Sequence, residues 1–327
     1  MAGTVFVTGG GGYVGSHCAK AFSHAGWTVV TYDNFSRGHR DLVKWGETIE
    51  GDILDRAGLD AALARVQPDA VAHFAAYAYV GESMASPEIY YRNNVRGTMT
   101  LLDAMLGAGV KQMVFSSSCA TYGISNDLIT EDTPQTPINP YGETKLICEK
   151  MIRDYGLAHG LRSVALRYFN AAGCDPDGET GERHDPEPHV IPLAIRGAMD
   201  GTFTFNIFGS DYDTPDGTCV RDYIHVTDLA DAHKRALDYL ANGGASDVFN
   251  LGTGQGHSVL DLANAVARVA GKDVPRIMAD RRPGDPPRLV ASADKAARIL
   301  GWTPQYSDLD TILETAWAWF QKEQANG

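Results

Sequence analysis

The chain has 327 residues, of which 44% are hydrophobic, and a formal net charge of -13 at pH 7. This length corresponds to about two domains with enough apolar side chains for a large core. A surface of this charge repels a phosphate backbone, so nucleic-acid binding is not expected. No window has the uncharged apolar run of a membrane span, and the start MAGTVFVTGG carries no basic leader. We therefore expect a globular, cytoplasmic protein that does not associate with membranes.

Short β-branched runs alternate with amphipathic stretches in the first half of the chain. Strands are predicted at 4–8, 28–32, 70–74, 112–116 and 164–169, with a helix from about Gly12. This βαβ pattern is typical of a parallel sheet with helices on both faces. We therefore predict an α/β fold, with a Rossmann-type doubly wound parallel sheet over residues 1–172.

The amino-acid composition changes after this first half. Residues 174–189 read CDPDGETGERHDPEPH, which is dense in glycine, proline and charge and predicts a long loop that leaves the sheet. A smaller α/β substrate-binding domain is predicted for residues 173–327. Strand patterns at 219–226 and 248–251, each followed by a helical pattern, indicate that residues 219–255 partly return to the sheet.

A glycine-rich segment joins the first strand to the first helix. Its glycines lie at three-residue spacing and are Gly9, Gly12 and Gly15. Backbone at such a turn can approach a pyrophosphate at the positive end of the helix dipole, although glycine loops also serve plain turns. The next strand ends in Asp33, about 20 residues further on, where a carboxylate can accept hydrogen bonds from an adenosine ribose. A carboxylate there repels a 2′-phosphate, so NAD is favoured over NADP, although Arg37 and Arg40 lie nearby.

A tyrosine and a lysine stand four residues apart at a predicted helix start. Tyr141 and Lys145 therefore share one helix face, with Cβ atoms about 5–6 Å apart. A tyrosine titrates near ~10, so it serves as a base at neutral pH only where positive charge favours the phenolate. Such a pair is common on helix surfaces. Its place after the glycine motif and after the serine-rich strand end at Ser118 favours proton abstraction from a secondary alcohol.

The five cysteines are scattered and lack Cys-x-x-Cys spacing. They are Cys18, Cys119, Cys148, Cys174 and Cys219. This pattern indicates neither a disulfide framework nor a zinc site, so we expect no metal and a reducing compartment.

Motifs along nearly the whole chain resemble the extended short-chain dehydrogenase/reductase family. They include VTGGGGYVGS at 7–16, PYGETKL at 140–146, LRYFNAAG at 166–173, FGSDYDTPDGTCVRDYIHV at 208–226 and RRPGDPPRLVAS at 281–292. The glycine and Tyr/Lys motifs are general to the superfamily. The stretches around Asn170 and at 208–226 are more specific, and in them the chain is similar to the UDP-glucose 4-epimerases.

The resemblance implies reversible epimerisation at carbon 4 of a UDP-hexose, UDP-glucose or UDP-galactose, through a transient 4-keto sugar and bound NAD. It implies that Tyr141 is the catalytic acid/base and that Lys145 holds the cofactor ribose and modulates the tyrosine pKa. Ser118 is implied to hydrogen-bond the 4-hydroxyl of the sugar.

The resemblance also implies two sets of binding residues. The cofactor set is Gly9, Gly12, Tyr13, Val14, Gly15, Asp33, Asn34, Ser36, Arg37, Gly38, Asp52, Ile53, Phe74, Ala75, Ala76, Ala78, Asn94, Ser116, Tyr141, Lys145, Tyr168 and Phe169. The UDP-sugar set is Ser118, Tyr141, Asn170, His189, Val190, Asn206, Phe208, Arg221, Arg282, Asp285 and Leu289. Arginines neutralise a diphosphate and an aromatic ring can cover uracil, which suits the second set.

Three positions depart from the family pattern or leave the substrate open. Ala78 stands where some members have a lysine, and His189 stands where some have an asparagine. Leu289, four residues after Asp285, occupies a position that helps decide whether an N-acetylated sugar fits. A 4-epimerase of UDP-N-acetylhexosamines or UDP-pentoses therefore stays an alternative.

Two further functions use a similar set of residues. A nucleotide-sugar 4,6-dehydratase begins with the same oxidation, but its relatives carry an Asp-Glu pair where this chain has Cys119 and Ala120. A non-enzymatic NAD sensor would have no need of the Tyr141, Lys145 and Ser118 group. For assembly we expect a homodimer, with helix faces at 91–105 and from Pro140 as candidate contacts, although such faces as often serve internal packing.

Overall fold

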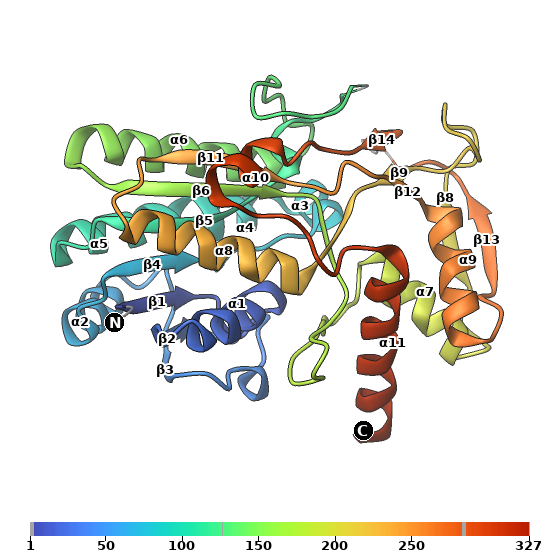
Figure 1. The fold of residues 1–327 in the computed structure, drawn as a ribbon, viewed down its shortest axis with the longest axis horizontal. Coiled ribbons are helices and arrows are strands. Elements are labelled where there is room, and N and C mark those ends of the chain that lie inside the picture. The colour runs from blue at the N-terminus through green and yellow to red at the C-terminus, as the bar shows by residue number, and fades with distance from the viewer. Residues whose placement is uncertain (1–2, 126, 283–285, 327) are drawn as a thin grey trace.

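A seven-stranded parallel sheet forms the centre of the molecule in the computed structural model, which describes residues 3–125, 127–282 and 286–326. The strand order is β11-β6-β5-β4-β1-β2-β3 (Figure 1). The strands are β1 (Thr4–Thr8), β2 (Thr28–Asp33), β3 (Glu47–Glu50), β4 (Ala70–His73), β5 (Gln112–Ser118), β6 (Arg162–Tyr168) and β11 (Asp247–Leu251). Without β11, the remaining six strands have the order β3-β2-β1-β4-β5-β6, which is that of a Rossmann sheet. This order confirms the predicted doubly wound fold.

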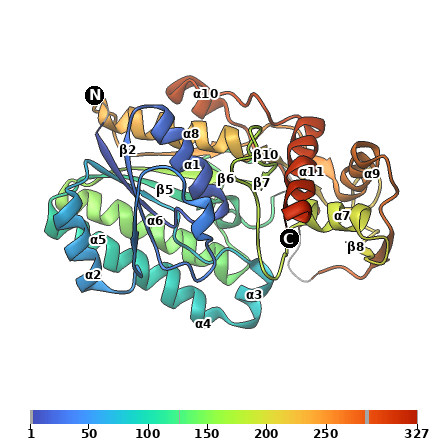
Figure 2. The ribbon, with the colours of Figure 1, turned by 90° about the horizontal axis from the view of Figure 1, so that it is seen from below.

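Helices cover both faces of this sheet (Figure 2). On one face lie α1 (Tyr13–His24), α8 (Val226–Ala241) and α10 (Asp294–Leu300), and on the other α2 (Arg56–Val66), α5 (Gly97–Ala108) and α6 (Pro140–His159). Adjacent residues of β1, such as Val5 and Phe6, enter opposite cores because side chains alternate along a strand. Both faces are therefore buried, which explains the nearly continuous apolar runs.

Short elements lie in the connections between the central strands. They are η1 (Arg40–Leu42), α3 (Val80–Ala85), α4 (Pro87–Tyr90), the π-helix η2 (Tyr91–Arg96) and η3 (Cys119–Thr121). Three of them, α3, η2 and η3, contribute residues to the site described below.

A second, smaller region lies beyond the carboxyl ends of the central strands (Figures 1 and 2). Its helices are α7 (Val190–Met199), α9 (Val259–Ala270) and α11 (Leu309–Asn326), which share one apolar core. Its short strands are β7 (Asn170–Ala172), β8 (Phe205–Phe208), β9 (Val220–Arg221), β10 (Tyr223–His225), β12 (His257–Ser258), β13 (Arg276–Ala279) and β14 (Arg288–Leu289). Residues 173–189, which contain no helix or strand, connect β7 to α7.

The segment 219–226 differs from the single strand expected there. It forms β9 and β10, which belong to two small sheets, whereas β11 joins the central sheet beside β6. The interruption falls at Asp222, whose buried carboxylate accepts hydrogen bonds from the backbone of Thr253 at 3.0 Å and of Ala291 at 3.3 Å. Because of these contacts with distant segments, residues 219–226 do not form one continuous strand. Within the described residues, no helix combines the length and apolarity needed to span a membrane.

Candidate active site

One cavity of about 1130 Å³ lies between the sheet and the second region. Its walls come from residues at or just beyond the carboxyl ends of six central strands, among them Gly9, Asp33, Phe74 and Ser118. Residues of the second region close the opposite side. Ligands of doubly wound folds bind outside these strand ends, and the volume exceeds the roughly 300–1,000 Å³ usual for one small ligand. The cavity can therefore hold two bound groups.

The glycine-rich turn forms the floor of the cavity beside the start of α1. Gly9 has a φ of 77°, which favours glycine, and a Cβ there would lie 2.5 Å from the backbone nitrogen of Ala75. A Cβ on Gly15 would lie 2.2 Å from the carbonyl oxygen of Gly9. The turn is thus tight because its glycines permit backbone contact. Gly12 caps α1, so the helix N-terminus faces the cavity and fits the pyrophosphate of a dinucleotide.

Asp33 lies at the end of β2 on the cavity wall. Its carboxylate accepts hydrogen bonds from the backbone nitrogens of Gly11 and Phe35, each at 2.8 Å. Burial raises its pKa above the ordinary value, while these hydrogen bonds oppose the shift. Gly11 and Phe35 thus fix the carboxylate where an adenosine ribose would lie in this fold.

The two arginines near Asp33 are both engaged elsewhere. The guanidinium of Arg37 pairs with Glu82 at 2.7 Å and lies 4.4 Å from the ring centre of Tyr77. Arg40 pairs with Glu50 and lies over a neighbouring ring. Both guanidinium groups already pair with carboxylates, so neither is positioned to bind a 2′-phosphate.

Helix α6 brings the tyrosine and lysine into the cavity. Asn139 caps the helix by accepting a hydrogen bond from the backbone nitrogen of Gly142 at 2.8 Å. A Cβ on Gly142 would lie 2.3 Å from the carbonyl oxygen of Ala120, so glycine lets the helix start rest directly on η3. This contact places Tyr141 beside the end of β5. Lys145, one turn later, donates to the carbonyl oxygen of Ser116 at 2.7 Å.

Burial dominates the electrostatics of this group. It raises the pKa of Tyr141 well above its ordinary value, the Tyr168 phenol adds to the rise, and a hydrogen bond with Ser118 opposes it. Burial also lowers the pKa of Lys145 to about 8. The lowered tyrosine pKa expected from the sequence depends on a nearby cation and on a positively charged nicotinamide. The side chains around Tyr141 by themselves raise that pKa, because they are mostly apolar or neutral. Lys145 lies 6.0 Å from the tyrosine ring centre, so positive charge on a bound cofactor is needed to favour the phenolate.

A buried ion pair ties α6 to the sheet. Arg167 on β6 donates two hydrogen bonds to the carboxylate of Glu149 on α6, at 2.9 and 2.5 Å. It donates a third to the hydroxyl of Tyr122 at 2.7 Å, and Ser117 on β5 donates to the same carboxylate at 2.5 Å. These bonds fix the rotation of α6, which decides where Tyr141 points.

The second region contributes aromatic, apolar and cationic side chains to the opposite wall. The guanidinium of Arg282 lies 3.8 Å from the ring centre of Phe208. Parallel pairing of β14 with β9 sets Leu289 opposite Arg221. Leu289 also packs against the cluster that contains Phe169. This wall fits a planar base and a diphosphate.

The structure brings nearly all the sequence-predicted site residues to this one cavity. Among the described residues, the exceptions are Asp52 and Asn94, which are not part of its lining. Asp52 instead accepts from the side chain of Asn34 at 2.9 Å. Asn94 accepts from the backbone nitrogen of Tyr77 at 2.8 Å, so both residues support the wall from behind. Asp285 lies outside the described residues.

Some lining residues were not identified from the sequence. The ring centre of Tyr79 lies 4.9 Å from the Arg37 guanidinium, and Glu82, which pairs with it, also accepts from Tyr90 at 2.7 Å. His184 and Glu187 come from the loop before α7 and also line the cavity. Only the histidine and glutamate spacing within that charged loop could have drawn attention to them.

Comparison with known proteins agrees with this geometry. A model of the NAD dependent epimerase/dehydratase family matches residues 5–252. The chain belongs to this family. The match ends just after β11. The part of this chain that corresponds to the family model therefore includes the central sheet and the Tyr141 to Lys145 segment.

Similar proteins cover almost the full chain. The UDP-glucose 4-epimerase of Rhizobium meliloti (strain 1021) is 54% identical over 324 residues, with 99% of this chain and 98% of the relative covered. The crystal structure of UDP-glucose 4-epimerase from Brucella ovis in complex with NAD is 53% identical, with a TM-score of 0.95 and 98% of both chains covered. The Stenotrophomonas maltophila UDP-glucose-4-epimerase with bound NAD and formylated UDP-arabinopyranose is 37% identical, has a TM-score of 0.95 and matches over 99% of this chain and 100% of the other.

Proposed function

We propose that this protein catalyses the reversible inversion of carbon 4 in UDP-hexoses, between UDP-glucose and UDP-galactose, with NAD held in the cavity. The observation that carries the proposal is the meeting of Tyr141, Ser118 and Lys145 in a cavity that also contains the glycine turn and the Arg282–Phe208 wall. Full-length similarity to UDP-glucose 4-epimerases supports the same conclusion.

The two halves of the chain divide the binding work in this proposal. Residues 1–172 hold NAD and residues 173–327 hold the UDP-sugar, with Asn170 at the boundary. The glycine turn and Asp33 fit the pyrophosphate and adenosine ribose. NAD supplies a group that accepts a hydride and returns it. Arg221 and Arg282 neutralise the diphosphate, and Phe208 covers the uracil.

Proton transfer falls to Tyr141 in this mechanism. As a phenolate it removes the proton of the 4-hydroxyl, and as a phenol it later returns a proton to the same oxygen. Ser118 hydrogen-bonds that oxygen and the phenol, which holds them within transfer distance. Lys145 holds positive charge next to the tyrosine. Because the uridine diphosphate provides the anchoring, the 4-keto sugar can turn and present its other face before reduction.

The reaction is tested by incubating the purified protein, without added NAD, with UDP-galactose and following the anomeric proton by NMR. Formation of UDP-glucose is expected, since the reaction has no net redox change and the cofactor stays bound. Parallel reactions with UDP-N-acetylgalactosamine and UDP-arabinopyranose measure substrate breadth at Leu289. Folded protein that converts none of the three even with NAD supplied would overturn the proposal.

The role of Tyr141 is tested by Tyr141→Phe, with Tyr155→Phe on the far part of α6 as the matched control. Loss of general acid/base catalysis is expected to lower turnover by about 10²–10⁴ while NAD and UDP still bind. Unchanged turnover in Tyr141→Phe would point to a binding protein such as an NAD sensor. The dehydratase alternative predicts a 4-keto-6-deoxy product in the NMR spectrum instead.

We also propose that the protein acts as a cytoplasmic homodimer. Exposed apolar side chains on η2 and α5, Tyr91, Met99 and Leu106, support a contact with a second copy. The five cysteines are free and buried, which suits a reducing compartment. Light scattering after gel filtration tests the dimer, and Met99→Glu is expected to shift it to a monomer. Fractionation of the source cells tests the compartment.

A further inference from the structure

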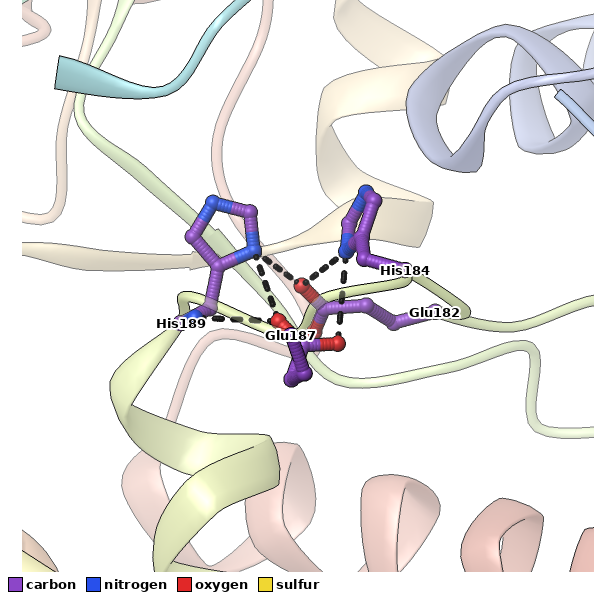
Figure 3. Close-up of side chains that lie close together, drawn as sticks. All are labelled: Glu182, His184, Glu187 and His189. Carbon is purple, nitrogen blue, oxygen red and sulfur yellow. Dashed lines mark hydrogen bonds and ion pairs between the residues drawn. The ribbon is translucent and has the colours of Figure 1, made fainter. Parts of the chain in front are cut away.

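Four potential metal ligands meet in the loop between β7 and α7. Glu182, His184, Glu187 and His189 alternate over eight residues, and Figure 3 shows both imidazoles and both carboxylates turned toward one point. One ligand atom from each residue lies within 4.8 Å of the other three. Glu182 is almost fully buried, and the other three are partly buried. The cluster is thus a feature of the cavity wall rather than of the outer surface.

The spacing of these atoms matches a four-coordinate ion. Nδ1 of His184 lies 3.4 Å from Glu182 and 3.3 Å from Glu187. Nδ1 of His189 lies 3.4 Å from Glu187 and 2.5 Å from Glu182. In a tetrahedral zinc site with bonds of about 2.1 Å, neighbouring ligand atoms are about 3.4 Å apart. Three of these four imidazole–carboxylate separations are near this value. They involve Oε2 of Glu187 for His184 and Oε1 for His189, so rotations of Glu187 and His189 are needed to bring one atom of each residue around a single ion.

The surroundings hold the ligands in place. The backbone nitrogen of His189 donates to Glu187 at 2.9 Å, and the indole of Trp319 donates to the carbonyl oxygen of Glu182 at 3.1 Å. The ring of Tyr79 packs edge-on against both histidines, at centroid distances of 5.6 and 6.0 Å. Such outer contacts orient first-sphere ligands in metal sites.

A second cluster, made of three carboxylates earlier in the same loop, already has a cationic partner. Asp175, Asp177 and Glu179 also converge, but each lies 2.8 Å from the ammonium of Lys20. That group already has its cation, supplied by the chain. The carboxylates of the histidine and glutamate cluster pair instead with imidazoles, which give up a proton when they bind a metal ion, and two imidazoles with two carboxylates form a donor set suited to zinc.

We propose that Glu182, His184, Glu187 and His189 bind one divalent transition-metal ion of the zinc class. Because all four positions come from the protein, the site is closed and structural rather than catalytic. The ion joins the loop that leaves β7 to the first residue before α7, and so fixes the wall of the cavity. The proposed epimerase activity needs no metal, but the cluster lines the same cavity and includes His189 of the UDP-sugar set.

Metal content of the untagged, NAD-containing protein tests the proposal. After equilibration with ZnCl₂ and gel filtration, elemental analysis is expected to find about one zinc ion per chain. His184→Ala and Glu187→Gln are expected to reduce this at least about fivefold, because each removes one of four ligands. His159→Ala removes an exposed histidine at the end of α6 and is expected to keep the wild-type content.

Cobalt and thermal unfolding provide readouts that do not depend on activity. Co²⁺ in the wild type and in His159→Ala is expected to give the visible absorption of a four-coordinate site, which His184→Ala lacks. ZnCl₂ is expected to raise the Tm of the wild type and not that of Glu187→Gln, because an ion that binds only the folded state stabilises it. Circular dichroism and retained NAD identify variants that remain folded.

Two results would overturn the proposal. One is folded wild-type protein that holds less than about 0.1 zinc ion per chain, which would leave two histidine protons as the occupants of the cluster. The other is equal metal content in the wild type and in folded His184→Ala, which would place the ion elsewhere. Neither result bears on the conversion of UDP-galactose.

Discussion

Removal of the Glu149 carboxylate is expected to destabilise the protein, because it leaves the buried guanidinium of Arg167 without a negatively charged partner. The side chains of Glu149 and Arg167 are only 9% and 6% exposed, so water screens their interaction little. Glu149→Leu removes the two hydrogen bonds from Arg167 and those from Ser117 and Gln135, and it leaves a buried guanidinium with Tyr122 as its remaining partner. Breaking a buried pair in this way costs about 3–5 kcal/mol. Most of that cost is the uncompensated charge.

A double-mutant cycle distinguishes this charge effect from lost packing. Glu149→Leu, Arg167→Met and the double variant are compared by urea unfolding followed with far-UV circular dichroism and tryptophan fluorescence. The double variant is expected to lose less stability than either single variant, because no unpaired charge remains. Asp60→Ala, which breaks the exposed pair with Arg56, is the control and is expected to leave the midpoint nearly unchanged.

The cycle also links stability to the site. Because Glu149 and Tyr141 share α6, the single variants are expected to bind NAD more weakly than the double variant. A loss below about 1 kcal/mol in folded Glu149→Leu, or equal losses in single and double variants, would refute the reasoning.

Three further outcomes are expected. Burial lowers the pKa of His233 to about 4, so below pH 6.5 the unfolded chain binds a proton there that the folded chain does not. The contribution of His233 to stability therefore falls by about 1.4 kcal/mol per pH unit between 6.5 and 4, in addition to those of His17, His73 and His225, and His233→Gln should reduce the total slope by that amount in urea titrations at several pH values. Gly15→Ala places a Cβ against Gly9 and should abolish NAD retention, measured after denaturation, whereas Gly201→Ala, with open space around it, should not. Arg282→Ala should weaken UDP binding about tenfold in calorimetry and leave NAD content unchanged; equal UDP affinity would contradict its placement at the diphosphate.

Local sequence features were sufficient for the main architecture. Strands β1, β2, β4, β5 and β6 lie where β-branched runs predicted them, since strands buried on both faces need nearly continuous apolar residues. The strand β3 was not predicted, because it is short, mostly exposed and carries glutamate at both ends. The break at Asp222 was also missed, because its hydrogen-bond partners come from residues 253 and 291.

The sequence by itself determined which chemical groups this protein has: the glycine turn, Asp33 and the Tyr141 to Lys145 spacing, all within short stretches whose local periodicity is informative. Only the tertiary structure decided how they are used. Glu82 engages Arg37 across 45 residues, and burial rather than a neighbouring cation governs the pKa of Tyr141. Trp319 of α11 donates to the carbonyl oxygen of Glu182 and so holds the loop that carries His184 from a distance of 137 residues along the chain. Such contacts depend on which surfaces pack together, and a local pattern does not contain that information.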